Sequence, residues 1–210
     1  MKDRKLKIVT GISSLILLIS LLIVLSRVPG GIVLSGFFIG CMIIVGVMIG
    51  CLLVGLILKS IFRNYSFLTI YSILTAVCFI ALHYYFYSPT LRIVVPKGYV
   101  GPVNLVLSNV DKNKLVLDSN GIGYINKWTF EKTYTEPIVT ETDGTKINDR
   151  CVGFNPSTFW GKGYSTISES NIKIHSISFE IVPADKKGQK QYYDKGLHAA
   201  VDTSLLSGIK

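Results

Sequence analysis

Residues 32–58 read Ile32-Val-Leu-Ser-Gly-Phe-Phe-Ile-Gly-Cys-Met-Ile-Ile-Val-Gly-Val-Met-Ile-Gly-Cys-Leu-Leu-Val-Gly-Leu-Ile-Leu58, without one charged side chain. Two further runs, Ile8–Leu25 and Phe67–Tyr87, also contain no Asp, Glu, Lys or Arg. A hydrocarbon core of about 30 Å needs roughly 20 apolar helical residues, and each run is close to or above that length. The sequence therefore predicts three membrane-spanning helices, at about 8–26, 32–58 and 66–87, in a transmembrane region that covers residues 1–88.

The composition changes where these runs end. The whole chain is apolar, with a mean hydropathy of +0.45, and its formal net charge is +9. Residues 1–88 hold seven Lys/Arg and one acid (+6), whereas residues 89–210 hold fifteen Lys/Arg and twelve acids (+3). Most of the positive excess therefore lies beside apolar helices, where the positive-inside rule accounts for it. We expect the lipid bilayer as a partner and no nucleic acid.

Basic residues that flank the runs predict an orientation. Six lie before the first run or after the second, namely Lys2, Arg4, Lys5, Lys7, Lys59 and Arg63, and three lie on the other side, namely Arg27, Arg92 and Lys97. We therefore expect a multi-pass protein of the cytoplasmic (inner) membrane, with a cytoplasmic N-terminus and residues 89–210 outside. The first run could instead be a signal peptide cleaved near Val24-Leu25-Ser26. Its length favours a retained helix, and cleavage would leave the following domain on the same side.

Four glycines of the second run form two GxxxG pairs, Gly36/Gly40 and Gly46/Gly50. At 100° per residue they fall within an arc of about 120° on one helix face. Such a face allows close approach of another helix, and close packing is a main source of helix association in lipid. The neighbour could be the first or third helix of the same chain, a second copy of the chain, or a partner subunit.

Residues 89–183 have the pattern of short strands separated by turns. The expected strands are Leu91–Val95, Val103–Leu107, Leu115–Leu117, Ile122–Ile125, Trp128–Phe130, Pro137–Thr140 and Ile172–Val182. Turn signals at intervals of about 8–12 residues favour a small antiparallel β-sandwich. Residues 184–210 are expected to be a tail or a short amphipathic helix.

The segment Ile93-Val-Val-Pro96-Lys-Gly98-Tyr99-Val-Gly101-Pro-Val103, followed by Asn120-Gly121-Ile122, has a recognisable pattern. It resembles a family of bacterial membrane and envelope β-domains of unknown function, whose pattern reads I-P-x-G-Y-x-G-x-V and then N-G-I/V. The resemblance covers about 35 residues and none of the helices. It implies a compact β-domain, often tethered to a membrane, and it assigns no particular activity. Independently of the family, glycine permits tight turns and proline ends a strand.

The segment Cys151–Ser170 is the least regular part of the expected β-domain. Four aromatic residues, Phe154, Phe159, Trp160 and Tyr164, alternate there with glycines and hydroxyl side chains. This composition is typical of a binding loop, for which an envelope glycan or a protein would be the ligand. The alternative is a long connection whose aromatic rings fold back onto the domain.

An enzyme is the remaining hypothesis. Cys151 and His175 are the one plausible nucleophile and base, since a thiol hydrolase needs a thiolate beside an imidazole. No family signature surrounds Cys151, and no Cys/His spacing resembles a zinc site. We therefore expect no catalytic residue, metal or cofactor. The favoured function is non-catalytic binding or scaffolding in the envelope. The alternatives are an accessory subunit of a transport or secretion complex, docked through the glycine face, and a thiol-dependent enzyme at Cys151.

Overall fold

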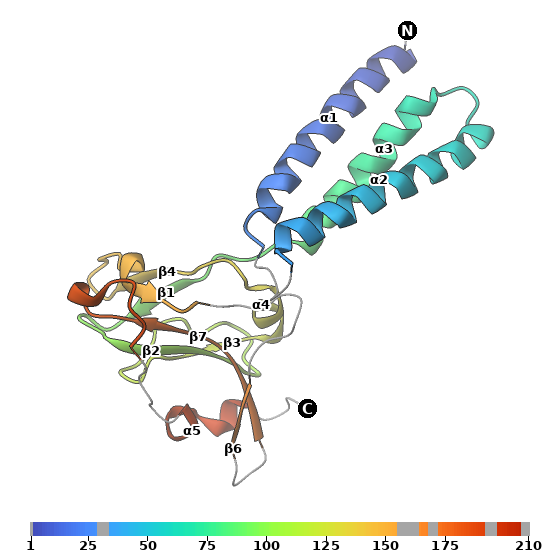
Figure 1. The fold of residues 1–210 in the computed structure, drawn as a ribbon. Helices are drawn as coiled ribbons and strands as arrows, with labels where there is room; N and C mark the ends of the chain where they lie inside the picture. Colours follow the sequence, from blue (N-terminus) through green and yellow to red (C-terminus); the bar gives the residue numbers. More distant parts are fainter. Residues whose placement is uncertain (1, 29–33, 155–163, 168–171, 192–196, 207–210) are drawn as a thin grey trace. The chain divides into compact units, whose positions relative to one another are not determined.

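The computed structural model describes residues 2–28, 34–154, 164–167, 172–191 and 197–206. The chain divides into two compact units, Met1–Tyr87 and Ser88–Lys210. The first unit, here the helical unit, contains α1 (Lys2–Leu25), α2 (Gly36–Ile61) and α3 (Phe67–Tyr85) (Figure 1). All three are long and apolar enough to cross a membrane, as the sequence predicts. The first helix begins at Lys2, before the apolar run, because Lys and Arg are good helix formers.

Serine residues define where the second and third helices begin. The Ser35 hydroxyl accepts a hydrogen bond from the Phe38 amide, and the Ser66 hydroxyl accepts one from the Thr69 amide. Such N-caps satisfy amide groups that have no partner inside the helix. The three helices pack against one another, and α1 contacts α3 most extensively. Two polar pairs join α1 to α3: Ser14 Oγ lies 2.8 Å from Thr75 Oγ1, and Ser20 Oγ lies 3.1 Å from His83 Nε2.

The second unit, here the β-domain, contains two sheets (Figure 1). One pairs β1 (Arg92–Val95) with β4 (Ile138–Glu141). The other has the order β3-β2-β7-β5, with β6 also paired to β7; these strands are β2 (Gly101–Leu107), β3 (Ile122–Ile125), β5 (Cys151–Val152), β6 (Tyr164–Ile167) and β7 (Ile172–Ile181).

The strand directions correct the sequence prediction of an antiparallel domain. Strands β1 and β4 run parallel, and so do β2 and β3, whereas β7 is antiparallel to β2, β5 and β6. Parallel neighbours need a connection of about a dozen residues or more, and the segments 96–137 and 108–121 provide it. The turn at Asp118–Gly121 therefore ends a crossover connection and does not close a hairpin. The two-stranded sheet is therefore parallel, and the larger sheet contains both parallel and antiparallel pairs.

One predicted strand is a helix. Trp128–Phe130 lies inside α4 (Lys127–Lys132), whose N-cap Asn126 accepts a hydrogen bond from the Thr129 amide at 2.9 Å. The predicted strand Leu115–Leu117 makes only an isolated bridge from Val116 to Val94. Short helical turns complete the domain: η1 (Asn148–Arg150), η2 (Ala184–Lys186), α5 (Leu197–Ala200) and η3 (Thr203–Leu206).

Buried side chains from both sheets meet in one hydrophobic core. It comprises Leu91, Ile93, Val95, Tyr99, Val103, Leu105, Leu117, Ile125, Phe130, Val139, Ile147, Ile177, Phe179 and Ile181. A second cluster, Val106, Ile122, Ile174, Val201 and Leu206, joins the larger sheet to the C-terminal segment. Residues 197–206 are thus packed onto the β-domain, since Val201 and Leu206 are both buried.

Candidate functional site

The turn that precedes β2 brings the sequence motif together. Tyr99 is buried, and its hydroxyl donates a hydrogen bond to the Pro102 carbonyl at 2.6 Å. Gly121, with φ of +72°, lies against this hydroxyl, so that a Cβ atom there would collide with Tyr99 Oη and the Pro102 carbonyl. The Gly121 carbonyl in turn accepts a hydrogen bond from the Asn104 amide at 2.9 Å. Residues about twenty positions apart in the sequence therefore form one tightly packed corner.

Burial, and to a smaller extent the negative charge of Asp118, raises the pKa of Tyr99 to about 12. The phenol consequently stays protonated at physiological pH and remains a hydrogen-bond donor. Its carbonyl partner is fixed by the turn. This hydrogen bond ties the Tyr99 ring to the backbone of the turn.

Arg150 is a charged residue of the same corner that sequence reasoning missed. Its guanidinium lies 3.2 Å from Glu141 Oε1 and donates hydrogen bonds to the carbonyls of Tyr99 (2.9 Å) and Val182 (2.8 Å). The Arg150 side chain is 14% exposed and that of Glu141 is 9% exposed. A buried ion pair needs such extra hydrogen bonds to offset its desolvation. Arg150 thus joins β4, the Tyr99 turn and the end of β7, and nothing in its local sequence marks this role.

The structure describes the predicted aromatic loop only in part. Phe154 packs against the core, edge-to-face with Phe179 at a ring distance of 6.0 Å and an angle of 77°. Phe159 and Trp160 lie outside the described residues, as does the Tyr164 side chain. The backbone on either side is described: Val152 pairs with Glu180, and Tyr164 pairs with His175. Val152 and Tyr164 are therefore both held by β7.

Cys151 and His175 do not form a catalytic pair. Cys151 lies opposite Ile181 of β7, six residues from His175, and at about 3.4 Å per residue this is a separation of roughly 20 Å. Burial raises the pKa of the Cys151 thiol to about 11, which is the opposite of what a reactive thiolate needs. The imidazole instead lies edge-on to Phe130, with ring centroids 6.2 Å apart.

The four glycines of α2 lie in two different environments. Gly36 and Gly40 are buried, and a Cβ atom on Gly40 would collide with Leu25 of α1. Around Gly46 and Gly50, in contrast, no described atom lies within 4 Å of where a Cβ atom would stand. Gly40 therefore packs against α1, whereas Gly46 and Gly50 leave open space among the described residues.

Comparisons with known proteins give little. No protein-family model matches the chain, and no curated protein matches it. Among solved structures, a chain described as "Putative Lipoprotein from Bacillus anthracis" aligns with 15% sequence identity and a TM-score of 0.28. The alignment covers 54% of the present chain and 88% of that chain. Likeness at this level does not bear on function.

Proposed function

We propose that this chain anchors its β-domain at the extracytoplasmic face of a bacterial cytoplasmic membrane, where the domain binds or scaffolds envelope components without catalysis. The observation that carries the proposal is the combination of three apolar helices of spanning length with a β-domain that has its own hydrophobic core. A domain with its own core can fold outside the bilayer. The resemblance of the Pro96–Val103 motif to envelope β-domains supports the same reading.

The arrangement of the helices supports the orientation. Within the helical unit, the N-terminal end of α1 and the connection from α2 to α3 lie at the same end (Figure 1). Six basic residues belong to this end, namely Lys2, Arg4, Lys5, Lys7, Lys59 and Arg63. Clusters of Lys and Arg stay on the cytoplasmic side. Three crossings then carry residue 88 and the chain after it to the opposite side.

Thiol labelling in intact cells tests the orientation. In a Cys151→Ser background, Val116→Cys would introduce a reporter in the β-domain, at a residue that is 72% exposed. Asn64→Cys, an exposed position on the α2–α3 connection, is the matched control. We expect a membrane-impermeant maleimide to label the Val116→Cys protein in intact cells and the Asn64→Cys protein only after lysis. The reverse pattern would place the β-domain in the cytoplasm and refute the proposal.

A second experiment tests the binding role. Trp160 belongs to the aromatic segment, whereas Trp128 is 49% exposed on α4 and serves as the control. We expect the full chain in detergent to be retained on isolated cell-wall material, retention to be lost on Trp160→Ala, and Trp128→Ala to have no effect. Equal retention of all three proteins would remove the aromatic segment from the proposal.

The open glycine pair favours one alternative function, an accessory subunit of a membrane transport or secretion complex. Gly46 and Gly50 leave room for a helix from outside the chain, and small residues allow such close approach in lipid. If this function is correct, mild-detergent extraction yields a larger complex that Gly46→Leu and Gly50→Leu dissociate. Extraction of an unchanged single species from wild type and variants would rule the alternative out.

A further inference from the structure

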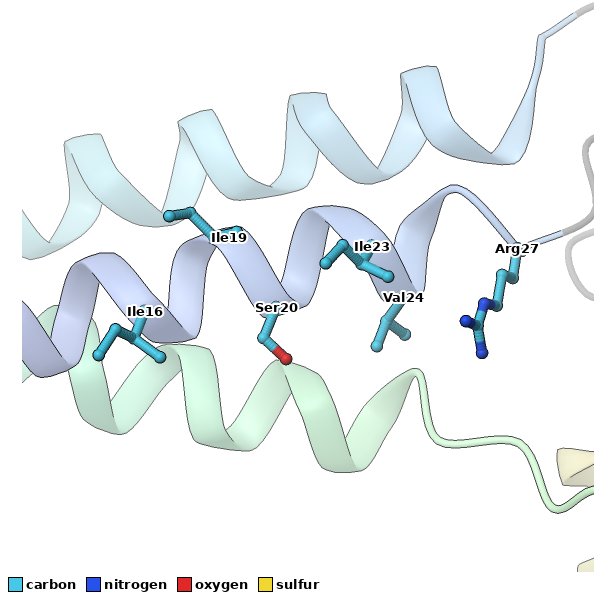
Figure 2. A pocket seen from close by; sticks show the side chains of 6 residues that line it. All are labelled: Ile16, Ile19, Ser20, Ile23, Val24 and Arg27. Atoms are coloured by element: carbon cyan, nitrogen blue, oxygen red, sulfur yellow. The ribbon is translucent and has the colours of Figure 1, made fainter.

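A shallow groove of about 350 Å³ runs along α1, lined by Ile16, Ile19, Ser20, Ile23, Val24 and Arg27 (Figure 2). Its walls are aliphatic, and the isoleucines are exposed: Ile16 by 61%, Ile19 by 52% and Ile23 by 55%. Its volume is at the lower end of the roughly 300–1,000 Å³ usual for small-molecule sites. The groove is therefore an apolar surface on a helix of membrane-spanning length, with one cationic residue in its lining.

The lining residues follow helical spacing. Ile16, Ser20, Ile23 and Arg27 are separated by four, three and four positions, so they lie on one face. The winding continues past the last residue of α1, because the Arg27 amide donates a hydrogen bond to the Val24 carbonyl at 3.1 Å. Figure 2 shows Ser20, Val24 and Arg27 projecting from the same side of the helix. The Arg27 guanidinium thus lies at one end of the apolar groove.

Ser20, the polar residue in the aliphatic part of the lining, has a partner on α3. The Ser20 hydroxyl lies 3.1 Å from His83 Nε2 of α3, and the other ring nitrogen of His83 lies 2.8 Å from the Phe79 carbonyl. These contacts take up the polar groups that face the apolar part of the groove. Arg27, in contrast, is exposed, and it makes no ion pair or side-chain hydrogen bond with any residue that the structure describes. The positive charge of Arg27 is therefore free to bind an anion at this end of the groove.

The dimensions match one leaflet of a bilayer. Arg27 lies eleven positions after Ile16, which is about 16 Å along a helix that rises 1.5 Å per residue. Half of a hydrocarbon core of about 30 Å is about 15 Å. An arginine near a helix end reaches the headgroup level, where a guanidinium binds phosphate with paired hydrogen bonds.

We propose that this groove is a binding site for an anionic phospholipid, with one acyl chain along Ile16, Ile19 and Ile23 and the headgroup phosphate on Arg27. The proposal requires that the helices lie in a bilayer, and it is independent of what the β-domain binds. The charge of Arg27 and the length of the groove, which matches one leaflet, favour a lipid over a second protein helix. A lipid has a phosphate for the cation at the end of the groove, whereas an apolar helix offers it no partner.

Native mass spectrometry of the full chain in mild detergent tests the proposal, with phosphatidylglycerol and phosphatidylcholine of identical acyl chains as probes. We expect one phosphatidylglycerol to be retained, with an affinity roughly fivefold above that of phosphatidylcholine, as one basic residue near the headgroups provides. Arg27→Gln should abolish this preference. Ile23→Trp, which fills the groove, should weaken the binding of both lipids.

The matched control is Arg63→Gln, which removes an exposed arginine at the other end of the helical unit. It should leave the preference unchanged. The proposal is overturned if Arg27→Gln keeps the preference, or if Arg63→Gln loses it equally, because the attraction would then be general. It is also overturned if Ile23→Trp leaves lipid retention intact, or if the spectra show a dimer that the same substitution dissociates. Thermal melting of each variant before the titration confirms that the helical unit is folded.

Discussion

Gly121 lies against the Tyr99 hydroxyl and has a backbone conformation that residues other than glycine rarely adopt. Replacing Gly121 with a larger residue would therefore cost free energy for two reasons, the positive φ and the lack of space for a side chain. Gly98 has nearly the same φ, +70°, but no described atom lies within 4 Å of where its Cβ atom would stand. A comparison of substitutions at Gly98 and Gly121 therefore separates the free-energy cost of the positive φ from that of the steric collision.

We predict that Gly121→Ala lowers the free energy of unfolding of the β-domain by about 3 kcal/mol, and Gly98→Ala by about 1 kcal/mol. The measurement is urea unfolding of the full chain in detergent, followed by tryptophan fluorescence. Both tryptophans, Trp128 and Trp160, belong to the β-domain, so the signal reports that unit. Equal effects of the two substitutions would show that the Tyr99 corner can relax.

Cys151 gives a prediction that depends on pH. Burial raises the pKa of its thiol from 9.0 to about 11 in the folded state. Because the folded pKa is the higher one, the associated stability is complete below pH 9 and is lost as the pH rises towards 11. The thiolate fraction of the folded chain should grow about tenfold per pH unit between pH 7 and 10.

The alkylation rate of Cys151 should therefore rise without a plateau over this range. Iodoacetamide labelling, followed by mass spectrometry of the Cys151 peptide, measures this rate, and the unfolded chain is the control. A plateau near neutral pH would indicate an activated thiolate and would revive the enzyme hypothesis.

At the scale of elements, α2 shows how one sequence motif can lie in two different environments. Its GxxxG pairs look equivalent in the sequence, yet a Cβ atom on Gly40 would collide with Leu25, whereas a Cβ atom on Gly46 would meet no described residue beyond its own helical turn within 4 Å. The difference between the two glycine pairs depends on where α1 lies beside α2. Helical periodicity in the sequence of α2 does not predict that position. Periodicity specifies only that the glycines share a face.

Substitution at the two positions should therefore have unequal effects. We predict that Gly40→Val destabilises the helical unit by about 2 kcal/mol, because the added methyl groups require Leu25 to move. Gly46→Val should change stability by less than about 0.5 kcal/mol. The measurement is titration of the purified chain with a denaturing detergent, followed by circular dichroism. A large effect at Gly46 in the isolated chain would show that this face is already occupied.

The element α4 shows the limit of pattern reading in the β-domain. Trp, Thr and Phe at positions 128–130 favour a strand by propensity, but the Asn126 side chain caps the Thr129 amide and begins a helix there. Phe130 is buried in the core, whereas Trp128 is half exposed. A short apolar run fits either structure, and the cap together with the burial of one ring decides between them.

At the scale of the whole molecule, the two units obtain their stability from different sources. Helices in a detergent or bilayer satisfy their backbone hydrogen bonds internally, and urea does little to that arrangement. The β-domain depends on a hydrophobic core that urea weakens. Because Ser88–Lys210 forms a compact unit of its own, we expect it to unfold separately.

We predict two transitions when the full chain in mild detergent is titrated with urea. Tryptophan fluorescence should report cooperative unfolding of the β-domain, while most of the helical signal at 222 nm persists. Addition of a denaturing detergent should then remove the remaining helical signal. A single coincident transition by both probes would mean that the units are stable only together.

The sequence by itself determined the three apolar helices, the change of character near residue 88, and the positions of most strands. These features follow from local composition and spacing, which act over a few residues. Only the tertiary structure decided the parallel strand pairs, the burial of Arg150 beside Glu141 and the Tyr99 turn, and the separation of Cys151 from His175. The physical reason is that register and burial depend on contacts between residues distant in the chain. No local pattern specifies those contacts, whereas the need to bury apolar surface and to satisfy every buried polar group selects among them.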